Sequence, residues 1–137
     1  MNEIGLLLAS VFSAGTVLAL AGLGLLINEK AGVINLGAEG MMLCAALAGY
    51  AICVHTGSPW LGFAAGMGAG AVLAAALGVL VIWLNTNQSA TGLALSLLGA
   101  GLSAFVGVPY TQQALMVRNQ FAIPVLSELP LVGKALF

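Results

Sequence analysis

Hydrophobic and polar positions alternate in long blocks along this chain. Uncharged or nearly uncharged runs cover residues 4–27, 32–54, 59–84 and 90–109, and short polar clusters separate them. A helix needs about 20 apolar residues to cross the hydrocarbon core of a bilayer. The pattern therefore predicts four transmembrane helices, because a helix satisfies its backbone groups internally and the alternation typical of a barrel strand is absent from the sequence.

The last part of the chain, residues 110–137, has a different character. Arg118 and Glu128 bring charges into it, and Pro130 interrupts it. This segment is too polar and too broken to span a bilayer. Ser127 is a candidate N-cap with Glu128 in the first turn, which predicts a short amphipathic helix at the membrane surface.

Composition supports a membrane protein and argues against a soluble one. Hydrophobic residues make up 61% of the chain and charged residues 5%, whereas a soluble domain has about a quarter charged residues. The net charge of −1 and the lack of a basic patch give no indication of nucleic-acid binding. The predicted fold class is an all-α integral membrane bundle of four transmembrane helices plus a short outer amphipathic segment, in a single domain.

A carboxylate inside the second predicted span is the first candidate for function. Inserting a charged side chain such as that of Glu39 at the centre of a membrane helix costs roughly 2.5 kcal/mol or more, so we expect Glu39 to face the bundle interior or water. Gly37 and Gly40 flank it and predict a helix break near Asn35 and Glu39, and such breaks often bind or gate the cargo of transporters. Two interpretations stay open: a pathway or gating residue, or a carboxylate that accepts hydrogen bonds from the backbone N–H groups of the following half-helix.

A second polar cluster precedes the fourth predicted helix. Asn87, Gln88 and Thr91 are candidates for the pathway or its gate, and the alternative is that Asn87 or Ser89 simply caps the helix. In the third span, three glycines at a spacing of four residues predict a ridge for close helix packing. These are Gly62, Gly66 and Gly70.

The sequence offers no catalytic or metal-binding motif. Cys44 and Cys53 lie in an apolar run without the spacing of a metal site, and His55 stands at the end of a span. A phosphate-binding GxxxxGK[ST] loop is absent from the sequence. We therefore expect no catalytic residue, no metal and no cofactor in this chain.

Three blocks resemble permease subunits of bacterial ABC importers for nucleosides and simple sugars. They are AGVINLGAEGMML at 31–43, NQSATGLALSLLGAGLSAFVGVPY at 87–110 and IPVLSELPLVGKALF at 123–137. Residues 33–39 also resemble, more distantly, branched-chain amino-acid permeases. Permeases of the family are considerably longer, and this chain resembles their N-terminal half.

The resemblance implies a transport subunit in the bacterial inner membrane. It implies an ABC ATPase subunit that binds ATP, a second permease subunit and an extracytoplasmic substrate-binding lipoprotein as partners. It also implies that the first and third loops are cytoplasmic and that residues 110–137 lie outside. Two alternatives from the residues alone are an ion-translocating proteolipid-like subunit that uses Glu39, and a structural membrane subunit.

Overall fold

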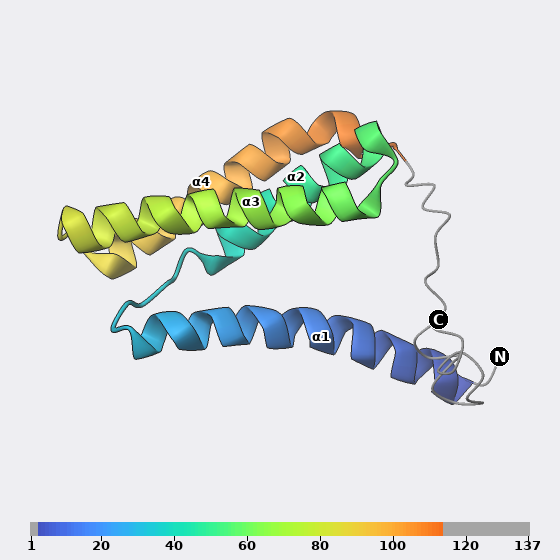
Figure 1. Ribbon diagram of the computed structural model, residues 1–137, viewed down its shortest axis with the longest axis horizontal. Helices are drawn as coiled ribbons and strands as arrows, with labels where there is room; N and C mark the ends of the chain where they lie inside the picture. The colour runs from blue at the N-terminus through green and yellow to red at the C-terminus, as the bar shows by residue number, and fades with distance from the viewer. Residues whose placement is uncertain (1–2, 114–137) are drawn as a thin grey trace. The chain divides into compact units, whose positions relative to one another are not determined.

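The structure, a computed structural model, describes residues 3–113, except for the side chains of residues 3–6 and 9. The described chain is helical and contains no strand (Figure 1). Four helices are long and apolar enough to cross a membrane, so the predicted all-α membrane class is confirmed. The elements are α1 (Glu3–Lys30), α2 (Ala38–Thr56), α3 (Pro59–Gly78), the π-helical turn η1 (Val79–Trp83), α4 (Gln88–Gly107) and the 3-10 turn η2 (Val108–Tyr110).

The chain divides into two compact units. Within the described residues, one unit is the part of α1 up to Leu26, and the other is residues 27–113. In the first unit, the Thr16 hydroxyl donates to the Phe12 carbonyl of the same helix at 2.7 Å. The predicted outer amphipathic helix around Ser127 lies outside the described residues.

Helix α1 ends in a glycine-dependent turn. Gly32 has φ +80°, a left-handed conformation that favours glycine. Its N–H donates to the Glu29 carbonyl at 3.0 Å, and the Val33 N–H donates to the Asn28 carbonyl at 2.9 Å. This pair of bonds is the Schellman arrangement, which satisfies the last carbonyls of a helix and turns the chain away from its axis.

Helix α2 begins later than the apolar pattern predicts. The second span was expected from residue 32, but residues 33–35 are non-helical and α2 starts at Ala38. The predicted break near Asn35 is therefore the connection between two helices rather than a kink within one. At its other end, α2 stops at Gly57, whose φ of +67° makes a left-handed C-cap. Pro59 then opens α3 in the first turn, where its missing N–H is tolerated.

The third apolar run does not stay α-helical to its end. Its last turn, η1, is a π-helix in which the Leu84 N–H reaches the Val79 carbonyl at 3.2 Å. The Leu80 carbonyl accepts from both the backbone N–H and the hydroxyl of Thr86, at 3.2 and 2.8 Å. The backbone groups freed at the end of η1 thus have partners before α4 begins.

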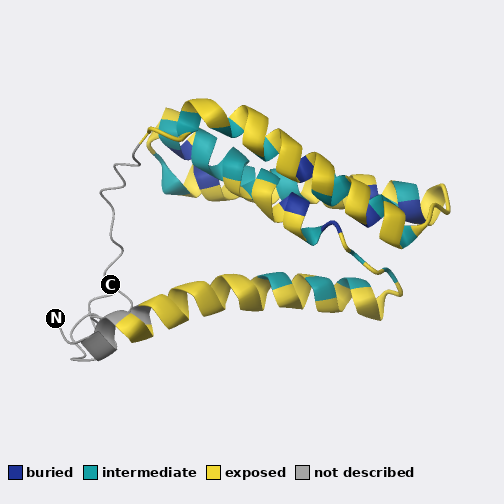
Figure 2. Cartoon of the chain, turned by 180° about the vertical axis from the view of Figure 1, so that it is seen from behind, coloured by how far each residue is buried: buried dark blue, intermediate teal, exposed yellow. Residues whose placement is uncertain are grey.

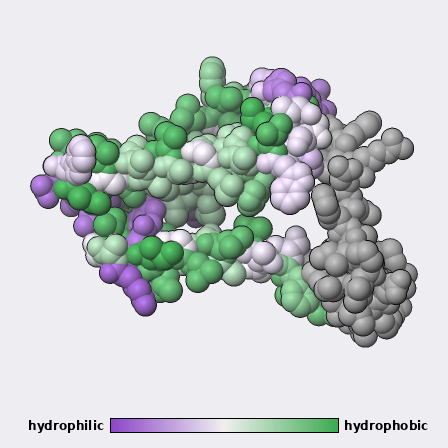
Figure 3. All heavy atoms as spheres, in the orientation of Figure 1, coloured by the Kyte–Doolittle hydropathy of each residue, from purple (hydrophilic) through white to green (hydrophobic). Residues whose placement is uncertain are grey.

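Helices α2, α3 and α4 run alongside one another, and α2 packs against both of the others (Figure 1). Their small core consists of Met41, Leu77 and Val81, with Val33 and Leu95 partly buried against it. Most other residues of α3 and α4 are exposed, whereas more than half of α2 is half-buried or buried (Figure 2). In the view of Figure 3 the exposed helix sides are hydrophobic, as membrane helices require, and hydrophilic residues gather toward the helix ends.

Candidate functional site at the end of the bundle formed by the first and third loops

Glu39 lies in the first turn of α2, not deep inside a span. The late start of α2 at Ala38 places it at the second position of the helix. Its side chain is exposed, so of the two expected surroundings, the bundle interior or water, it does not face the interior of the described bundle. Within residues 3–113 its carboxylate makes no hydrogen bond or ion pair, and the nearby Met41 N–H instead donates to the Gly37 carbonyl at 3.0 Å. A negative charge there interacts favourably with the N-terminus of the helix dipole.

Asn35 shapes the entry into α2. Its side-chain oxygen accepts from the Gly37 N–H at 3.0 Å, which forms a local turn directly before the helix. Its amide nitrogen lies 3.8 Å from the Met41 sulfur. Both polar atoms of the Asn35 side chain therefore have partners between Gly37 and Met41.

Gln88 joins the two loops across the end of the bundle. Its side-chain oxygen accepts from the Ile34 N–H at 2.8 Å, and its amide nitrogen donates to the Gly32 carbonyl at 3.4 Å. The carboxamide thus pairs with one backbone donor and one backbone acceptor of the non-helical connection between α1 and α2. The first and third loops consequently lie at the same end of the three-helix unit.

The remaining polar candidates also contact the chain itself. Asn87 is the N-cap of α4, and its side-chain oxygen accepts from the Ala90 N–H at 3.1 Å. The Thr91 hydroxyl lies 2.9 Å from the Thr86 hydroxyl. The structure therefore gathers Asn35, Asn87, Gln88 and Thr91 near one end of the unit, where each makes a hydrogen bond within the chain.

The glycine ridge of α3 meets α2 at two of its three positions. A Cβ added to Gly62 would lie 2.7 Å from the Gly49 carbonyl oxygen, and one added to Gly66 would lie 2.9 Å from the Ala45 carbonyl oxygen. At Gly70 the nearest atom would be the Ala45 Cβ at 3.8 Å, an ordinary contact.

Sequence reasoning missed the contact between α2 and α4. A Cβ on Gly40 would lie 2.6 Å from the Ser96 Cα, and one on Gly99 would overlap the backbone of Gly40. A Cβ on Gly92 would likewise lie 3.0 Å from the backbone nitrogen of Leu36, in the loop before α2. The spacing of seven residues between Gly92 and Gly99 was a signal for this face, but its partner could not be read from one segment.

The opposite end of the unit holds an aromatic cluster that sequence reasoning also missed. The Tyr110 hydroxyl lies 3.1 Å from His55 Nε2, and the Tyr50 hydroxyl donates to the Gln113 carbonyl. The rings of Tyr50 and His55 both meet Tyr110 edge to face, with centroids 6.4 and 5.8 Å apart. The cluster fastens the end of α2 to the residues after α4.

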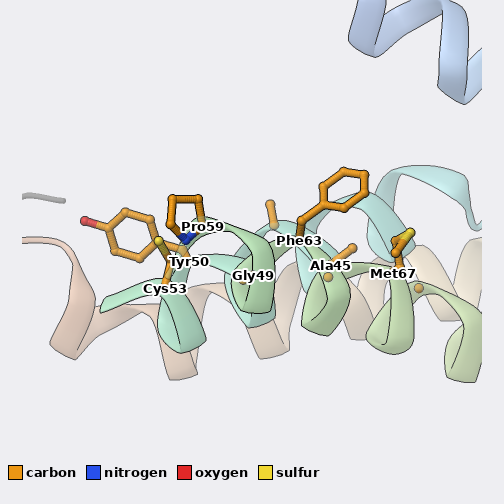
Figure 4. Close-up of a pocket in the computed structure, with 11 residues that line it drawn as sticks. Ala45, Gly49, Tyr50, Cys53, Pro59, Phe63 and Met67 are labelled. Atoms are coloured by element: carbon orange, nitrogen blue, oxygen red, sulfur yellow. The ribbon is translucent and has the colours of Figure 1, made fainter. Parts of the chain in front are cut away.

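An open groove of about 700 Å³ runs along α2 and α3 (Figure 4). Ala45, Gly49 and Cys53 form one side of it, and Phe63 and Met67 rise from the other. Its lining is almost wholly apolar. The groove therefore suits hydrocarbon and offers few hydrogen bonds to a polar solute.

Comparison with known proteins identifies the family. The family described as the permease component of the branched-chain amino acid transport system matches residues 7–132. A protein of Haloferax volcanii named as a glucose ABC transporter permease is 49% identical, over 97% of this chain and 41% of its own length. No solved structure matches the chain.

Two further relatives carry nucleoside names. The nucleoside ABC transporter permease protein of Lactococcus lactis is 26% identical over all of this chain and 46% of its own length. The guanosine ABC transporter permease protein of Bacillus subtilis is 29% identical over 88% of this chain and 41% of its own length. The chain spans less than half the length of these relatives. It is a multi-pass membrane protein and belongs to this permease family.

Proposed function

We propose that the chain forms part of the membrane permease of an ABC importer and contributes its helices to the translocation pathway. The observation that carries this proposal is the match of the permease family to residues 7–132 of a chain with four helices able to cross a membrane. The family favours this function over a proteolipid-like or purely structural subunit. The position of Glu39 at a helix end also differs from the mid-membrane carboxylate that a proteolipid would use.

The proposed solute is a simple sugar or a nucleoside. This rests on the names of the relatives, which include glucose and guanosine transporters. Both solutes are neutral and rich in hydroxyl groups. The chain has few charges, three basic residues (Lys and Arg together) and four acidic ones (Asp and Glu together), which suits a neutral solute.

The proposed partners follow from the importer class. ATP would bind and be hydrolysed on a separate ABC ATPase subunit, a second permease subunit would complete the pathway, and an extracytoplasmic substrate-binding lipoprotein would deliver the solute. In this arrangement the end with Gln88 and the first loop faces the cytoplasm, and the end with Tyr50, His55 and Tyr110 faces outward. Helix α3 runs antiparallel to α2 and α4, and Gln88 at the start of α4 bonds to the loop before α2, which supports a common side for the first and third loops.

Reconstitution tests the proposal. The chain is expressed with the remaining subunits of its importer, purified in mild detergent and placed in proteoliposomes with ATP inside or outside. We expect an ATPase subunit to co-purify. Labelled glucose or guanosine should cross the membrane only when ATP is on the side of the ATPase subunit and the binding lipoprotein is on the opposite side. Uptake that is independent of ATP, or purification without an ATPase subunit, would refute it.

A further inference from the structure

The span formed by α3 and η1 is the most apolar one in the described part of the chain. Between Pro59 and Trp83 it holds no charged, hydroxyl or amide side chain, and its polar side-chain groups are the indole N–H groups of Trp60 and Trp83. Each of the other three spans carries hydroxyl, amide or charged side chains. The side chains of this span therefore suit hydrocarbon wherever protein does not cover them.

The two tryptophans of the chain stand at the two ends of this span. Trp60 is the second residue of α3, and Trp83 is the last residue of η1. Polar residues begin within two positions of each ring, at Ser58 before the span and at Asn85 after it. The change from apolar to polar sequence therefore coincides with a tryptophan at both ends.

The spacing of the tryptophans matches the thickness of a bilayer. From Trp60 to Trp83 the helical span measures roughly 34 Å at an α-helical rise, whereas the hydrocarbon core is about 30 Å thick and the headgroup regions bring the total to about 40–45 Å. Both rings thus fall just outside the hydrocarbon, where tryptophan is enriched in membrane proteins. Helix α3 alone, which ends at Gly78, would reach only about 27 Å from Trp60. The π-helical turn η1 therefore carries the span to the second interface.

Both tryptophans leave the helix on the side away from the packed unit. Gly62 is buried against a carbonyl oxygen of α2, and Val81 is buried at 6% exposure. Trp60 and Trp83 each stand two residues from one of them, and two α-helical residues turn the chain by about 200°, to nearly the opposite side. The two rings are 68% and 80% exposed, and Val72, midway between them, is 69% exposed. The outer side of the span is therefore open at both ends and in the middle.

We propose that this outer side lies at the lipid-facing periphery of the protein, where Trp60 and Trp83 anchor the span in the two interfaces of the bilayer. The occupant of the surface is phospholipid, with acyl chains along Val72 and headgroups at the level of the two rings. An indole joins a large apolar ring to one N–H donor, which suits the boundary between hydrocarbon and water. Packing against a further helix would explain neither the bilayer spacing of the rings nor their position where the apolar sequence ends.

Tryptophan fluorescence in vesicles tests this placement. The complex that co-purifies with the chain is reconstituted in phosphatidylcholine whose acyl chains carry bromine either close to the headgroup or near their ends, because bromine quenches tryptophan on contact. Trp60→Phe and Trp83→Phe each remove one indole, and the difference from the unmodified complex isolates its signal from the tryptophans of other subunits. Val72→Trp, made in a background with both phenylalanine substitutions, is the matched control at mid-span.

We expect bromine near the headgroup to quench each native tryptophan at least about twofold more than bromine at the chain ends, and the order to reverse for Val72→Trp. Little quenching of either native ring by both lipids would overturn the proposal, because protein would then cover that end of the span. Stronger quenching of either native ring by the deep bromine would also overturn it, because the ring would lie within the hydrocarbon.

The test does not depend on a single variant. The native signals come from the phenylalanine differences alone, so they are read even if Val72→Trp fails to assemble. Trp60→Tyr and Trp83→Tyr, which keep an amphipathic ring at the interface, replace any phenylalanine variant that does not assemble.

Discussion

Helix α2 makes two contacts of different construction. Toward α4, a Cβ on Gly40 would come within 2.6 to 2.8 Å of three backbone atoms of Leu95 and Ser96. Toward α3, a Cβ on Gly62 or Gly66 would approach one carbonyl oxygen each, at 2.7 and 2.9 Å. The first is tightest at the crossing of Gly40 with Gly99 and has a second close approach of Gly92 to the loop before α2, and the second is spread along the helix.

The difference indicates how each contact tolerates change. Backbone atoms on both sides of the α2–α4 crossing are fixed by their own helical hydrogen bonds, so no flexible side chain can move aside. Along α2 and α3, a small shift at one glycine is shared with its neighbours along the helix. We therefore expect a single added methyl group to damage the α4 contact more than the α3 contact.

The largest effect is expected at the crossing. Gly99→Ala would place its methyl group on the Gly40 backbone, and overpacking of this kind costs about 1 to 3 kcal/mol. Gly101→Ala on the same helix is the control, because a Cβ there meets nothing within 4 Å. Thermal unfolding of the purified protein in detergent should show a lower midpoint for Gly99→Ala only. Equal midpoints for the two variants would show that the crossing is not tight.

A smaller loss is expected along α3. Gly62→Ala would meet the Gly49 carbonyl oxygen at 2.7 Å and the Cys53 Cβ at 2.9 Å, which places it at the lower end of about 1 to 3 kcal/mol. Gly68→Ala is its control, with nothing within 4 Å. The same unfolding measurement ranks the contacts, and a loss at Gly62 larger than at Gly99 would reverse the comparison.

Gln88 is a second attachment of α4, by side chain rather than by backbone. Gln88→Ala removes its bonds to Ile34 and Gly32, and each such bond contributes about 0.5 to 1.5 kcal/mol. Water at the membrane end replaces part of this, so we expect a loss below that of Gly99→Ala. Ser89→Ala, which removes no hydrogen bond within the described residues, serves as the control. Uptake by the full importer should fall with Gln88→Ala if the first loop gates transport, and unchanged uptake would leave Gln88 a structural residue.

The smallest effect is expected at Gly70, with the opposite sign. Its added Cβ would stand 3.8 Å from Ala45, and alanine is favoured over glycine inside a helix by roughly 0.5 to 1 kcal/mol. Gly70→Ala should therefore leave the unfolding midpoint unchanged or raise it slightly. A clear decrease would show that the whole glycine ridge is packed.

The helices were predictable from the sequence because apolar runs separated by polar clusters report membrane spans directly. The start of α2 was not, because hydropathy does not register the glycine turn at Gly32 or the local bond of Asn35. That single difference moved Glu39 from the interior of a span to an exposed first turn. The depth expected for Glu39 inside the second span therefore differs from its place at the start of α2.

The candidate site was only partly predictable. Asn87 and Gln88 stand out as polar residues before a long apolar run, and the capping alternative for Asn87 was readable from its position. The target of Gln88 was not readable, because it lies 54 residues away at Ile34. The crossing of Gly40 with Gly99 escaped notice for the same reason: a glycine pattern shows which face is small, but only the packed helices show what meets it.

The reach of Gln88 has a consequence for how the protein is made. The turn at Gly57 joins α2 to α3 within a few residues, so this hairpin can assemble as soon as both helices enter the membrane. The bond from Gln88 to Gly32 spans 56 residues, and contacts between distant segments form late because a long loop must close first. Until the beginning of α4 emerges from the ribosome, the peptide groups of Gly32 and Ile34 have to be hydrated. The first loop is therefore completed only after α2 and α3 have been synthesised.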